Sequence, residues 1–306
     1  MIEYYKKIMR KNELAKLNNY SKGCWINVVD PSNEEVDFLV DKFNLEKDLL
    51  LDGLDIYEIP RIEEENKRAY IFLRMPTSKV ANEYTSSFLV IISKDLFITI
   101  SNNKLELVDK IIHTRKEFLT NQKTRSLLQV LLFLSTRYNA KIRTILKAVR
   151  KSRRDIKGLD ERDLLDLVMH EDRLNDYLLS FNPLINIHSM MLRLKSVKFK
   201  EEEKEFIEDL IVDLNQTLTS CKIALKSITN MRDYYSTTLS SNLNKILKVL
   251  TIFTVFLTIP TVFASIYGMN VNLPYQNLKS IFWILGGIVV LIWGIALVVF
   301  RKAKIL

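Results

Sequence analysis

Residues 245–306 contain neither aspartate nor glutamate, although the whole chain has 36 acidic residues. The residues before this point are charged and have the composition of a soluble protein. The absence therefore divides the chain into two chemically different regions. Apolar stretches without negative charge are typical of segments that lie in a membrane.

Cysteine and histidine are also scarce. The two cysteines, Cys24 and Cys221, lie far apart, which excludes a disulfide framework and suits a reducing cytoplasm. None of the three histidines has the spacing of a zinc-peptidase motif, and no phosphate-binding P-loop occurs. We therefore expect neither an enzyme nor an ATP-driven pump. The N-terminus lacks the apolar core of a secretory signal.

The net charge is +9, but six of the positive charges follow residue 244 and flank apolar segments: Lys245, Lys248, Lys279, Arg301, Lys302 and Lys304. This distribution does not indicate nucleic-acid binding. A local exception is the basic run at 141–158. It is consistent with a solvated helix face, or with electrostatic contact to lipid headgroups or to a neighbouring subunit.

The N-terminal region, 1–103, has the pattern of a mixed α/β domain. Ser32 and Glu35 form a capping box that predicts a helix start. Runs rich in β-branched and aromatic residues predict strands of one small sheet at Cys24–Val29, Ala69–Met75, Phe88–Ile92 and Leu96–Ile100.

The rest of the soluble part is predicted to be helical. Apolar residues at helical spacing indicate helices over Leu105–Leu119, Ser126–Val149 and Asp163–Phe181, with a break or kink at Asn182-Pro183 and a second break near Val197–Lys200. From Glu203 to Ile266 there is no glycine and only one proline, Pro260. One long helix that continues into a membrane span is the simplest interpretation, and a coiled-coil rod that merely anchors the protein is the alternative.

Two segments of membrane length follow, 246–266 and 281–300. Basic residues before the first and after the second predict that both chain ends are cytoplasmic and that the loop is external. The expected organisation is a cytoplasmic α/β domain (1–103), a helical region (104–200), a stalk (201–245), a first span (246–266), an external loop (267–280), a second span (281–300) and a basic tail (301–306).

Hydroxyl side chains follow one face of the first span. They alternate at three- and four-residue spacing, as Thr251, Thr254, Thr258, Thr261 and Ser265. The same spacing continues backward through Leu247, Asn244, Ser240, Thr237 and Asp233. Such residues can bond their own backbone carbonyls or allow close helix packing, or they can form a water-accessible pore wall. A pore would require an oligomer, because one copy cannot enclose it.

The tetrapeptide Tyr267-Gly268-Met269-Asn270 lies between the two spans. Asn270 could offer a neutral oxygen to a hydrated cation, while Gly268 permits a close turn and Met269 can pack behind it. In this context the chain resembles the CorA-type magnesium transporter family, whose hallmark is Gly-Met-Asn at this place. The resemblance implies a funnel-shaped homopentamer that takes up Mg²⁺, and often Co²⁺ and Ni²⁺, down its electrochemical gradient.

The resemblance also implies roles for particular residues. Gly268, Met269 and Asn270 would form the selectivity filter. The pore would be lined by Asn244, Leu247, Leu250, Thr254, Thr258, Thr261 and Ser265. Asp233 would lie at the cytoplasmic pore entrance, and Asp209 would bind regulatory Mg²⁺ between subunits. Cytoplasmic Mg²⁺ would hold the pore closed.

The chain departs from the family pattern in two respects. The stretch 271–280 has no acidic residue, whereas many members have one soon after the motif. Thr258 and Ser265 stand where a bulky apolar residue and a glycine are common, which favours a more hydrated pore. Met269 favours Mg²⁺ over the zinc-transporting branch. The alternatives are a Zn²⁺ or Co²⁺ transporter of the same architecture, or a membrane-anchored scaffold or signalling protein that conducts no ions.

Overall fold

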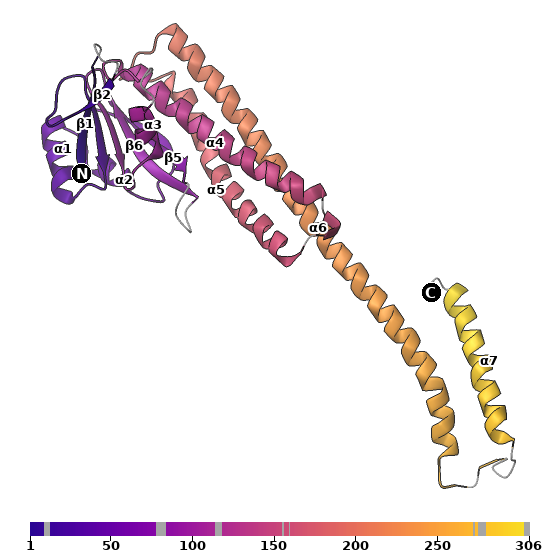
Figure 1. Cartoon of the computed structure of the whole chain (residues 1–306). Coiled ribbons are helices and arrows are strands. Elements are labelled where there is room, and N and C mark those ends of the chain that lie inside the picture. Colours follow the sequence, from indigo (N-terminus) through magenta and orange to yellow (C-terminus); the bar gives the residue numbers. More distant parts are fainter. Residues whose placement is uncertain are drawn as a thin grey trace. The chain divides into compact units, whose positions relative to one another are not determined.

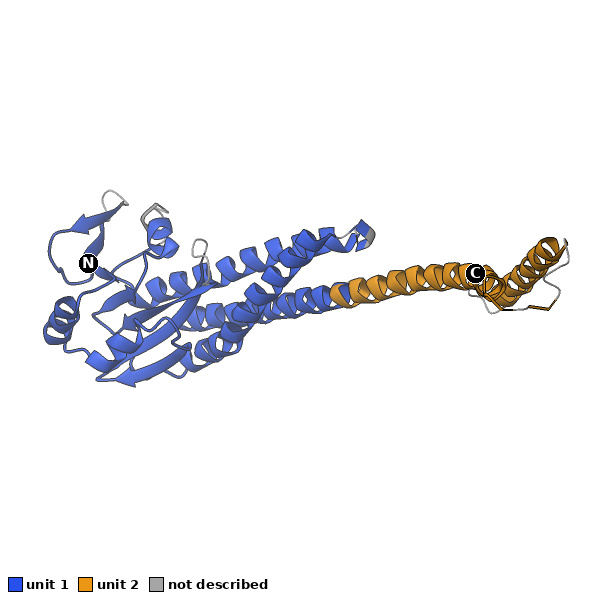
Figure 2. Cartoon of the chain, turned by 90° about the horizontal axis from the view of Figure 1, so that it is seen from below, with its two compact units in different colours: residues 1–231 blue, residues 232–306 orange. Residues whose placement is uncertain are grey.

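The chain forms two compact units, residues 1–231 and 232–306, and the boundary between them lies within one long helix (Figure 2). The computed structural model describes residues 1–8, 13–77, 84–113, 118–154, 156–158, 160–271, 273–274 and 280–302. Parts of the expected external loop (272 and 275–279) and of the basic tail (303–306) lie outside the described residues.

The first unit is built on a seven-stranded sheet of order β2-β1-β3-β7-β6-β5-β4 (Figure 1). β3 and β7 pair in parallel, and the other neighbouring strands pair antiparallel. The strands are β1 (Ile2–Ile8), β2 (Glu13–Leu17), β3 (Trp25–Val29), β4 (Arg61–Glu65), β5 (Arg68–Pro76), β6 (Thr85–Ile92) and β7 (Phe97–Ser101). Three of the four predicted strands are confirmed within one residue of their bounds, and the fourth, β6, begins three residues earlier than the predicted Phe88 because its first residues, Thr85 to Ser87, are polar.

Helices cover both faces of this sheet, so alternate residues of the central strands enter two different cores. On β5, Tyr70 and Phe72 join the core under α1 (Asn33–Phe43) and α2 (Lys47–Asp52). Ile71 and Leu73 join the core under the helices of the opposite face. Strands covered on both faces are apolar at nearly every position, and β6 is buried along its whole length. The capping box of Ser32 and Glu35 at the start of α1 is confirmed.

Three expected features differ from the structure. The edge strands β2 and β4 and the adjacent β1 were not predicted, because they carry many charged residues and have no continuous apolar run. The helix expected to extend to Leu119 is α3 (Glu106–His113), and Phe118 is not helical. α4 (Lys123–Arg154) is longer than expected at both ends.

Of the break or kink predicted at Asn182-Pro183, the break is wrong, because α5 (Glu161–Met191) continues through Pro183. Proline removes one backbone hydrogen bond from a helix. Here Phe181, Leu184 and Ile187 are all buried in one core on either side of the proline. Tertiary packing therefore outweighs the local cost. The second predicted break is confirmed, because α5 ends at Met191 and α6 begins at Glu201.

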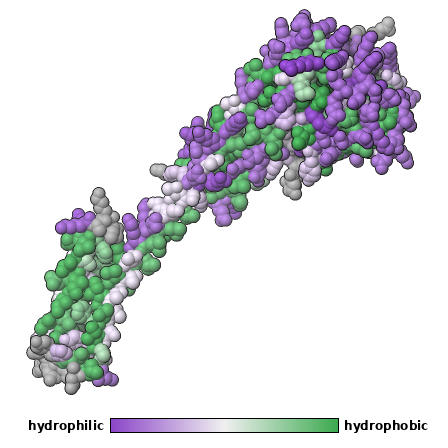
Figure 3. Space-filling view, turned by 180° about the vertical axis from the view of Figure 1, so that it is seen from behind, coloured by the Kyte–Doolittle hydropathy of each residue, from purple (hydrophilic) through white to green (hydrophobic). Residues whose placement is uncertain are grey.

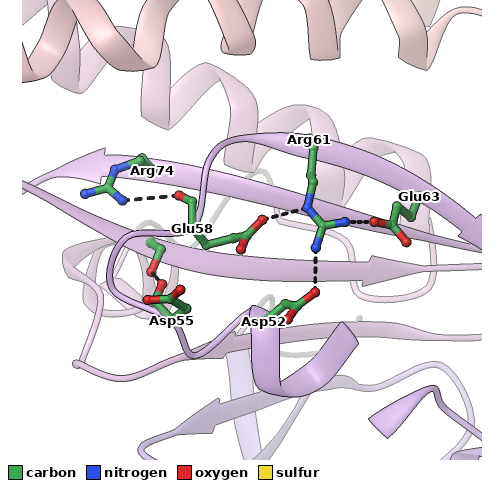
Figure 4. Close-up of polar contacts among 7 residues, drawn as sticks. Asp52, Asp55, Glu58, Arg61, Glu63 and Arg74 are labelled. Atoms are coloured by element: carbon green, nitrogen blue, oxygen red, sulfur yellow. Dashed lines mark hydrogen bonds and ion pairs between the residues drawn. The ribbon is translucent and has the colours of Figure 1, made fainter. Parts of the chain in front are cut away.

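A set of ionic contacts fixes the connection between α2 and β4 (Figure 4). Arg61 donates to Asp52 Oδ2 at 2.7 Å and to Glu58 Oε1 at 2.6 Å, and it also pairs with Glu63. Its guanidinium lies over the Phe72 ring, 4.1 Å from the centroid. Arg74 donates to the Glu58 carbonyl. These contacts tie the connection between α2 and β4 to the edge strand β4, and the Arg61 guanidinium offsets the charge of the three carboxylates around it.

The second unit contains the C-terminal part of α6 (Glu201–Tyr267) and all of α7 (Ile281–Lys302). Both helices are long and apolar enough to cross a membrane, and Val289 is the only buried residue among the described residues of α7. Figure 3 shows the apolar surface of these segments in green. An apolar surface exposed to this extent is stable only when lipid or other copies of the chain cover it.

Candidate functional site

The packing of α7 distinguishes two faces of the α6 span. Trp293 of α7 donates its indole N–H to the Phe256 carbonyl at 2.9 Å, and the two rings lie 5.6 Å apart between centroids. Ile252, Ile259 and Phe263 share the Phe256 face and are partly buried. Successive helical residues are rotated by about 100°, which places the Phe256 face roughly opposite the hydroxyl stripe.

The hydroxyl stripe is part of the uncovered surface of α6, which also includes the apolar side chains of Phe253 and Leu257. Thr254, Thr258, Thr261 and Ser265 are all exposed, as are Asn244, Leu247 and Leu250 further back along α6. A shallow hollow of about 800 Å³ follows the same face, lined by Thr237, Ser240, Ser241, Asn244, Lys245, Leu247, Lys248 and Thr251. One face of α6 therefore presents neutral oxygen atoms over many turns while α7 packs against another.

The threonine hydroxyls donate to their own helix. Thr251, Thr254 and Thr258 each donate to the carbonyl four residues earlier at 2.8 Å, and Thr261 does so at 2.7 Å. This is the local bonding that the sequence left as one explanation of the stripe. A threonine hydroxyl that donates in this way can still accept hydrogen bonds, because its oxygen keeps its lone pairs. The stripe is therefore a row of acceptors whose donors are already satisfied.

The Gly-Met-Asn segment directly follows the helix. Gly268 N–H donates to the Ala264 carbonyl at 2.9 Å, and Met269 N–H donates to the Ile266 carbonyl at 3.3 Å. The turn does not use a left-handed glycine, because the only described glycine with positive φ is Gly23. Glycine is favoured at position 268 because the backbone comes close to the preceding turn of the helix: a Cβ atom on Gly268 would lie 3.1 Å from the Ala264 carbonyl oxygen.

The neighbours of the motif leave Asn270 accessible. The Tyr267 hydroxyl donates to the Pro274 carbonyl at 3.3 Å, which ties the helix end to the start of the loop. Asn270 and Met269 are exposed, so the Asn270 amide is available to a ligand. The hydrogen bond to Pro274 was not predicted, because its acceptor is a backbone carbonyl that every residue carries.

The two predicted acidic residues are both exposed side chains on α6, Asp209 in the first unit and Asp233 in the second. Glu205 and Asp213, one helical turn from Asp209 on either side, are exposed as well. Their four-residue spacing was visible in the sequence but was not used. Within the described residues, no three histidine, cysteine or carboxylate side chains of one chain gather closely enough to hold a metal ion.

The chain is similar to known transport proteins over most of its length. Residues 20–302 match the family model described as CorA-like Mg²⁺ transporter protein. The chain is 28% identical over 290 residues to the cobalt/magnesium transport protein CorA of Methanocaldococcus jannaschii, covering 91% of this chain and 90% of that protein. It is 24% identical over 301 residues to the magnesium transport protein CorA of Campylobacter jejuni, covering 91% and 90%.

The fold agrees with a solved structure as well. The complete structure of the CorA magnesium transporter from M. jannaschii superposes with a TM-score of 0.85, at 23% identity, over 99% of this chain and 98% of that one. The match includes the soluble α/β region, the long helix and both apolar C-terminal helices. This chain is a member of the CorA-like Mg²⁺ transporter family, a family of transporters rather than of enzymes.

Proposed function

We propose that this protein conducts Mg²⁺ across a membrane, down its electrochemical gradient and into the cell. One observation carries the proposal. The hydroxyl stripe lies on the side of α6 opposite the apolar Phe256 face, and it is the Phe256 face that packs on Trp293 of α7. A helix that places oxygen atoms opposite its partner helix is suited to line a water-filled path rather than to face lipid.

The path requires several copies of the chain. One α6 helix cannot enclose a pore, and closed rotational symmetry would bring the same face of every copy to one axis. Family membership favours five copies. In such a homopentamer, α6 would form the inner ring and α7 the lipid-facing ring. Asn244, Leu247 and Leu250 would form the narrow cytoplasmic half of the pore, and Thr254 to Ser265 the outer half.

The chemistry of the wall suits a hydrated ion. Mg²⁺ prefers octahedral oxygen ligands and dehydrates reluctantly, so it keeps several waters wherever it can. Those waters direct their hydrogens outward and need acceptors around them. The threonines of the stripe supply acceptors whose own protons already bond the helix at 2.7–2.8 Å. The Asn270 amide oxygens would form the corresponding ring at the mouth, with Gly268 and Met269 shaping the turn.

Regulation would use the acidic residues of α6. Asp233 would concentrate cations at the inner end of the pore. Cytoplasmic Mg²⁺ at Asp209, bridged to a carboxylate of the neighbouring subunit, would offset the repulsion between subunits and favour the closed state. A shared site agrees with the absence of a three-ligand metal cluster within the described part of one chain.

The proposed location is the plasma or inner membrane, with both termini in the cytoplasm. Lys245 before the first span, Lys248 in its first turn, and Arg301 and Lys302 after the second span support this orientation through the positive-inside rule. Co²⁺ is a second proposed cargo, because the M. jannaschii relative carries cobalt in its name. Competition between Mg²⁺, Co²⁺ and Zn²⁺ in one flux assay would rank the three ions.

The test is Mg²⁺ influx into proteoliposomes that contain a Mg²⁺-sensitive dye. Asn270→Ala removes the proposed ring of amide oxygens from an exposed position outside both protein cores, so the fold should survive. Flux should fall about tenfold or more, which corresponds to about 1.4 kcal/mol in the barrier. The matched control is Asn175→Ala, which changes an exposed asparagine on α5 of the soluble unit and should leave flux unchanged.

Each alternative predicts a different result. Equal flux in the native protein and in Asn270→Ala would separate the conduit from the Gly-Met-Asn segment. No flux in either, from folded and correctly oriented protein, would favour the scaffold interpretation. Preferential Zn²⁺ flux that Mg²⁺ fails to inhibit would favour a zinc transporter of the same architecture.

A further inference from the structure

Three connections of the soluble unit meet at a pocket of about 480 Å³ that the transport proposal does not use. They are the turn between β6 and β7, the N-terminal end of α4, and the connection between α5 and α6. The pocket is lined by Ile92, Ser93, Lys94, Asn121, Lys123, Thr124, Lys195, Ser196, Val197 and Lys198. Four of these residues are lysines, and none of the described residues that line the pocket is acidic, although the Glu203 carboxylate lies next to it and accepts from the Thr124 hydroxyl at 2.8 Å.

Lys123 is the unusual member of this set. Its side chain is only 7% exposed, although lysine is rarely buried without a charged partner. Its Nζ donates to the Cys24 carbonyl at 3.0 Å and to the Thr120 carbonyl at 2.8 Å. An ammonium has three donors. Within the described part of the chain, no further acceptor and no carboxylate ion pair is found for Lys123.

The backbone adds to the positive potential. Lys123 and Thr124 are the first residues of α4, a helix of 32 residues. The first N–H groups of a helix have no partner within it, and the helix dipole is positive at this end. A helix N-terminus alone is a general feature of proteins, but here it coincides with a buried ammonium that has an unused donor and with three further lysines.

Hydrogen bonds within the protein hold the backbone of two of the three connections around the pocket. Glu64 Oε1 accepts from the backbone N–H groups of Lys195 and Ser196 at 3.0 and 2.8 Å, which anchors the α5–α6 connection. In the β6–β7 turn, Ser93 N–H donates to the Leu96 carbonyl at 2.9 Å, and its hydroxyl accepts from the Leu96 N–H at 3.2 Å. A preformed site loses little conformational entropy on binding.

We propose that this pocket binds a small phosphate-bearing anion through Lys94, Lys123, Lys195 and Lys198. Phosphate oxygens would take the unused Lys123 donor and the first amides of α4, while the exposed lysines would neutralise the remaining charge. A second hollow of about 810 Å³ shares Lys94 and Lys195 with the first, and its lining adds the basic residues Lys67 and Arg68 together with the acidic residues Glu64 and Asp95. The combined space admits a ligand larger than a single phosphate.

The same chemistry could come from an inorganic phosphate or from a nucleotide, so the experiment uses both. Inorganic phosphate, pyrophosphate and ATP are titrated separately into the full chain in detergent, in Mg²⁺-free buffer at constant ionic strength, and the heat of binding is measured. Without Mg²⁺, the ligand cannot reach carboxylates through a bridging cation. We expect saturable binding of pyrophosphate or ATP with Kd below about 1 mM.

The variant that tests the site is Lys94→Gln/Lys195→Gln, because both side chains are exposed and their loss should not disturb folding. It should weaken binding about tenfold or more. The control is Arg150→Gln/Lys151→Gln, an equal change of charge on an exposed part of α4 away from the pocket, which should alter Kd by less than about twofold. Lys123→Met, where it folds, should abolish binding.

Absence of saturable binding for all three ligands up to about 10 mM would overturn the proposal. Equal weakening in the two double variants would also overturn it, because attraction would then depend only on net charge. Displacement of ATP by pyrophosphate would assign recognition to the phosphate groups. Binding of ATP alone would assign the site to a nucleotide.

Discussion

Replacement of Thr258 by valine tests whether the hydroxyl stripe touches a hydrated ion. Valine keeps the branched shape of threonine and removes only the hydroxyl, whose proton bonds the Thr254 carbonyl at 2.8 Å. That carbonyl remains an acceptor of its ordinary helical hydrogen bond. The helix should therefore persist, and the principal loss is one acceptor per subunit on the uncovered face.

The size of the effect follows from the hydrogen bonds that the passing ion would lose. A typical hydrogen bond contributes about 0.5–1.5 kcal/mol net. If two hydroxyls of the ring accept from the hydration shell at the same time, at about 0.5–1 kcal/mol each, the barrier rises by roughly 1–2 kcal/mol. Flux should then fall roughly 5- to 30-fold. If instead the stripe faces lipid, valine should leave flux unchanged and should not reduce stability.

The assay is dye-reported Mg²⁺ influx in proteoliposomes at matched protein incorporation. Thr219→Val is the control, because Thr219 makes the same bond, to the Asn215 carbonyl at 2.9 Å, on an exposed part of α6 in the soluble unit. Thr258→Ser should retain most of the flux, since the hydroxyl returns. Native flux in Thr258→Val, with the oligomer intact by size-exclusion chromatography, would refute the assignment of the stripe to the pore wall.

Two further predictions concern the soluble unit. Asp209→Ala should raise the cytoplasmic Mg²⁺ concentration needed to close the pore. Asp209→Lys should alter gating too, because a fixed cation replaces the ionic bridge. Flux measured against internal Mg²⁺ checks both variants, and an unchanged dependence on Mg²⁺ in both would exclude Asp209 as a regulatory ligand. Burial lowers the pKa of Lys123 from 10.5 to about 8. Cys24 and Asp95 have smaller effects that raise this pKa, and the positive charge of Lys6 lowers it further. Between pH 8 and 10.5, Lys123 therefore binds more protons in the unfolded chain than in the native protein. In this range its contribution to the free energy of unfolding should increase with pH, by at most about 1.4 kcal/mol per pH unit. Lys123→Met should lack this component in thermal unfolding of the detergent-solubilised chain, and an identical pH dependence in both proteins would contradict the buried-ammonium interpretation.

Much of the fold was predictable because the informative segments are strongly patterned. The four apolar runs became strands, and the stretch of more than sixty residues without glycine became part of α6. The edge strands were missed because their exposed positions carry charges, as in Glu63 to Glu65 of β4, and charge weakens the apolar alternation by which strands are identified. The break predicted at Pro183 was wrong for a related reason. The sequence shows that proline removes a helical hydrogen bond, but it does not show that Phe181 and Leu184 are buried.

The candidate site shows where inference from the sequence ends. Spacing places the hydroxyls on one face of a helix, but a polar face can equally bond its own carbonyls, and the structure contains those bonds. The direction in which the face points depends on α7, and the contact between Trp293 and the Phe256 carbonyl has no sequence motif, because a backbone oxygen accepts the bond. The contact with α7 shows that the stripe lies opposite the packed side of α6. The same limit applies to Lys123, whose burial follows from three connections meeting around it, and which in sequence is one of many lysines.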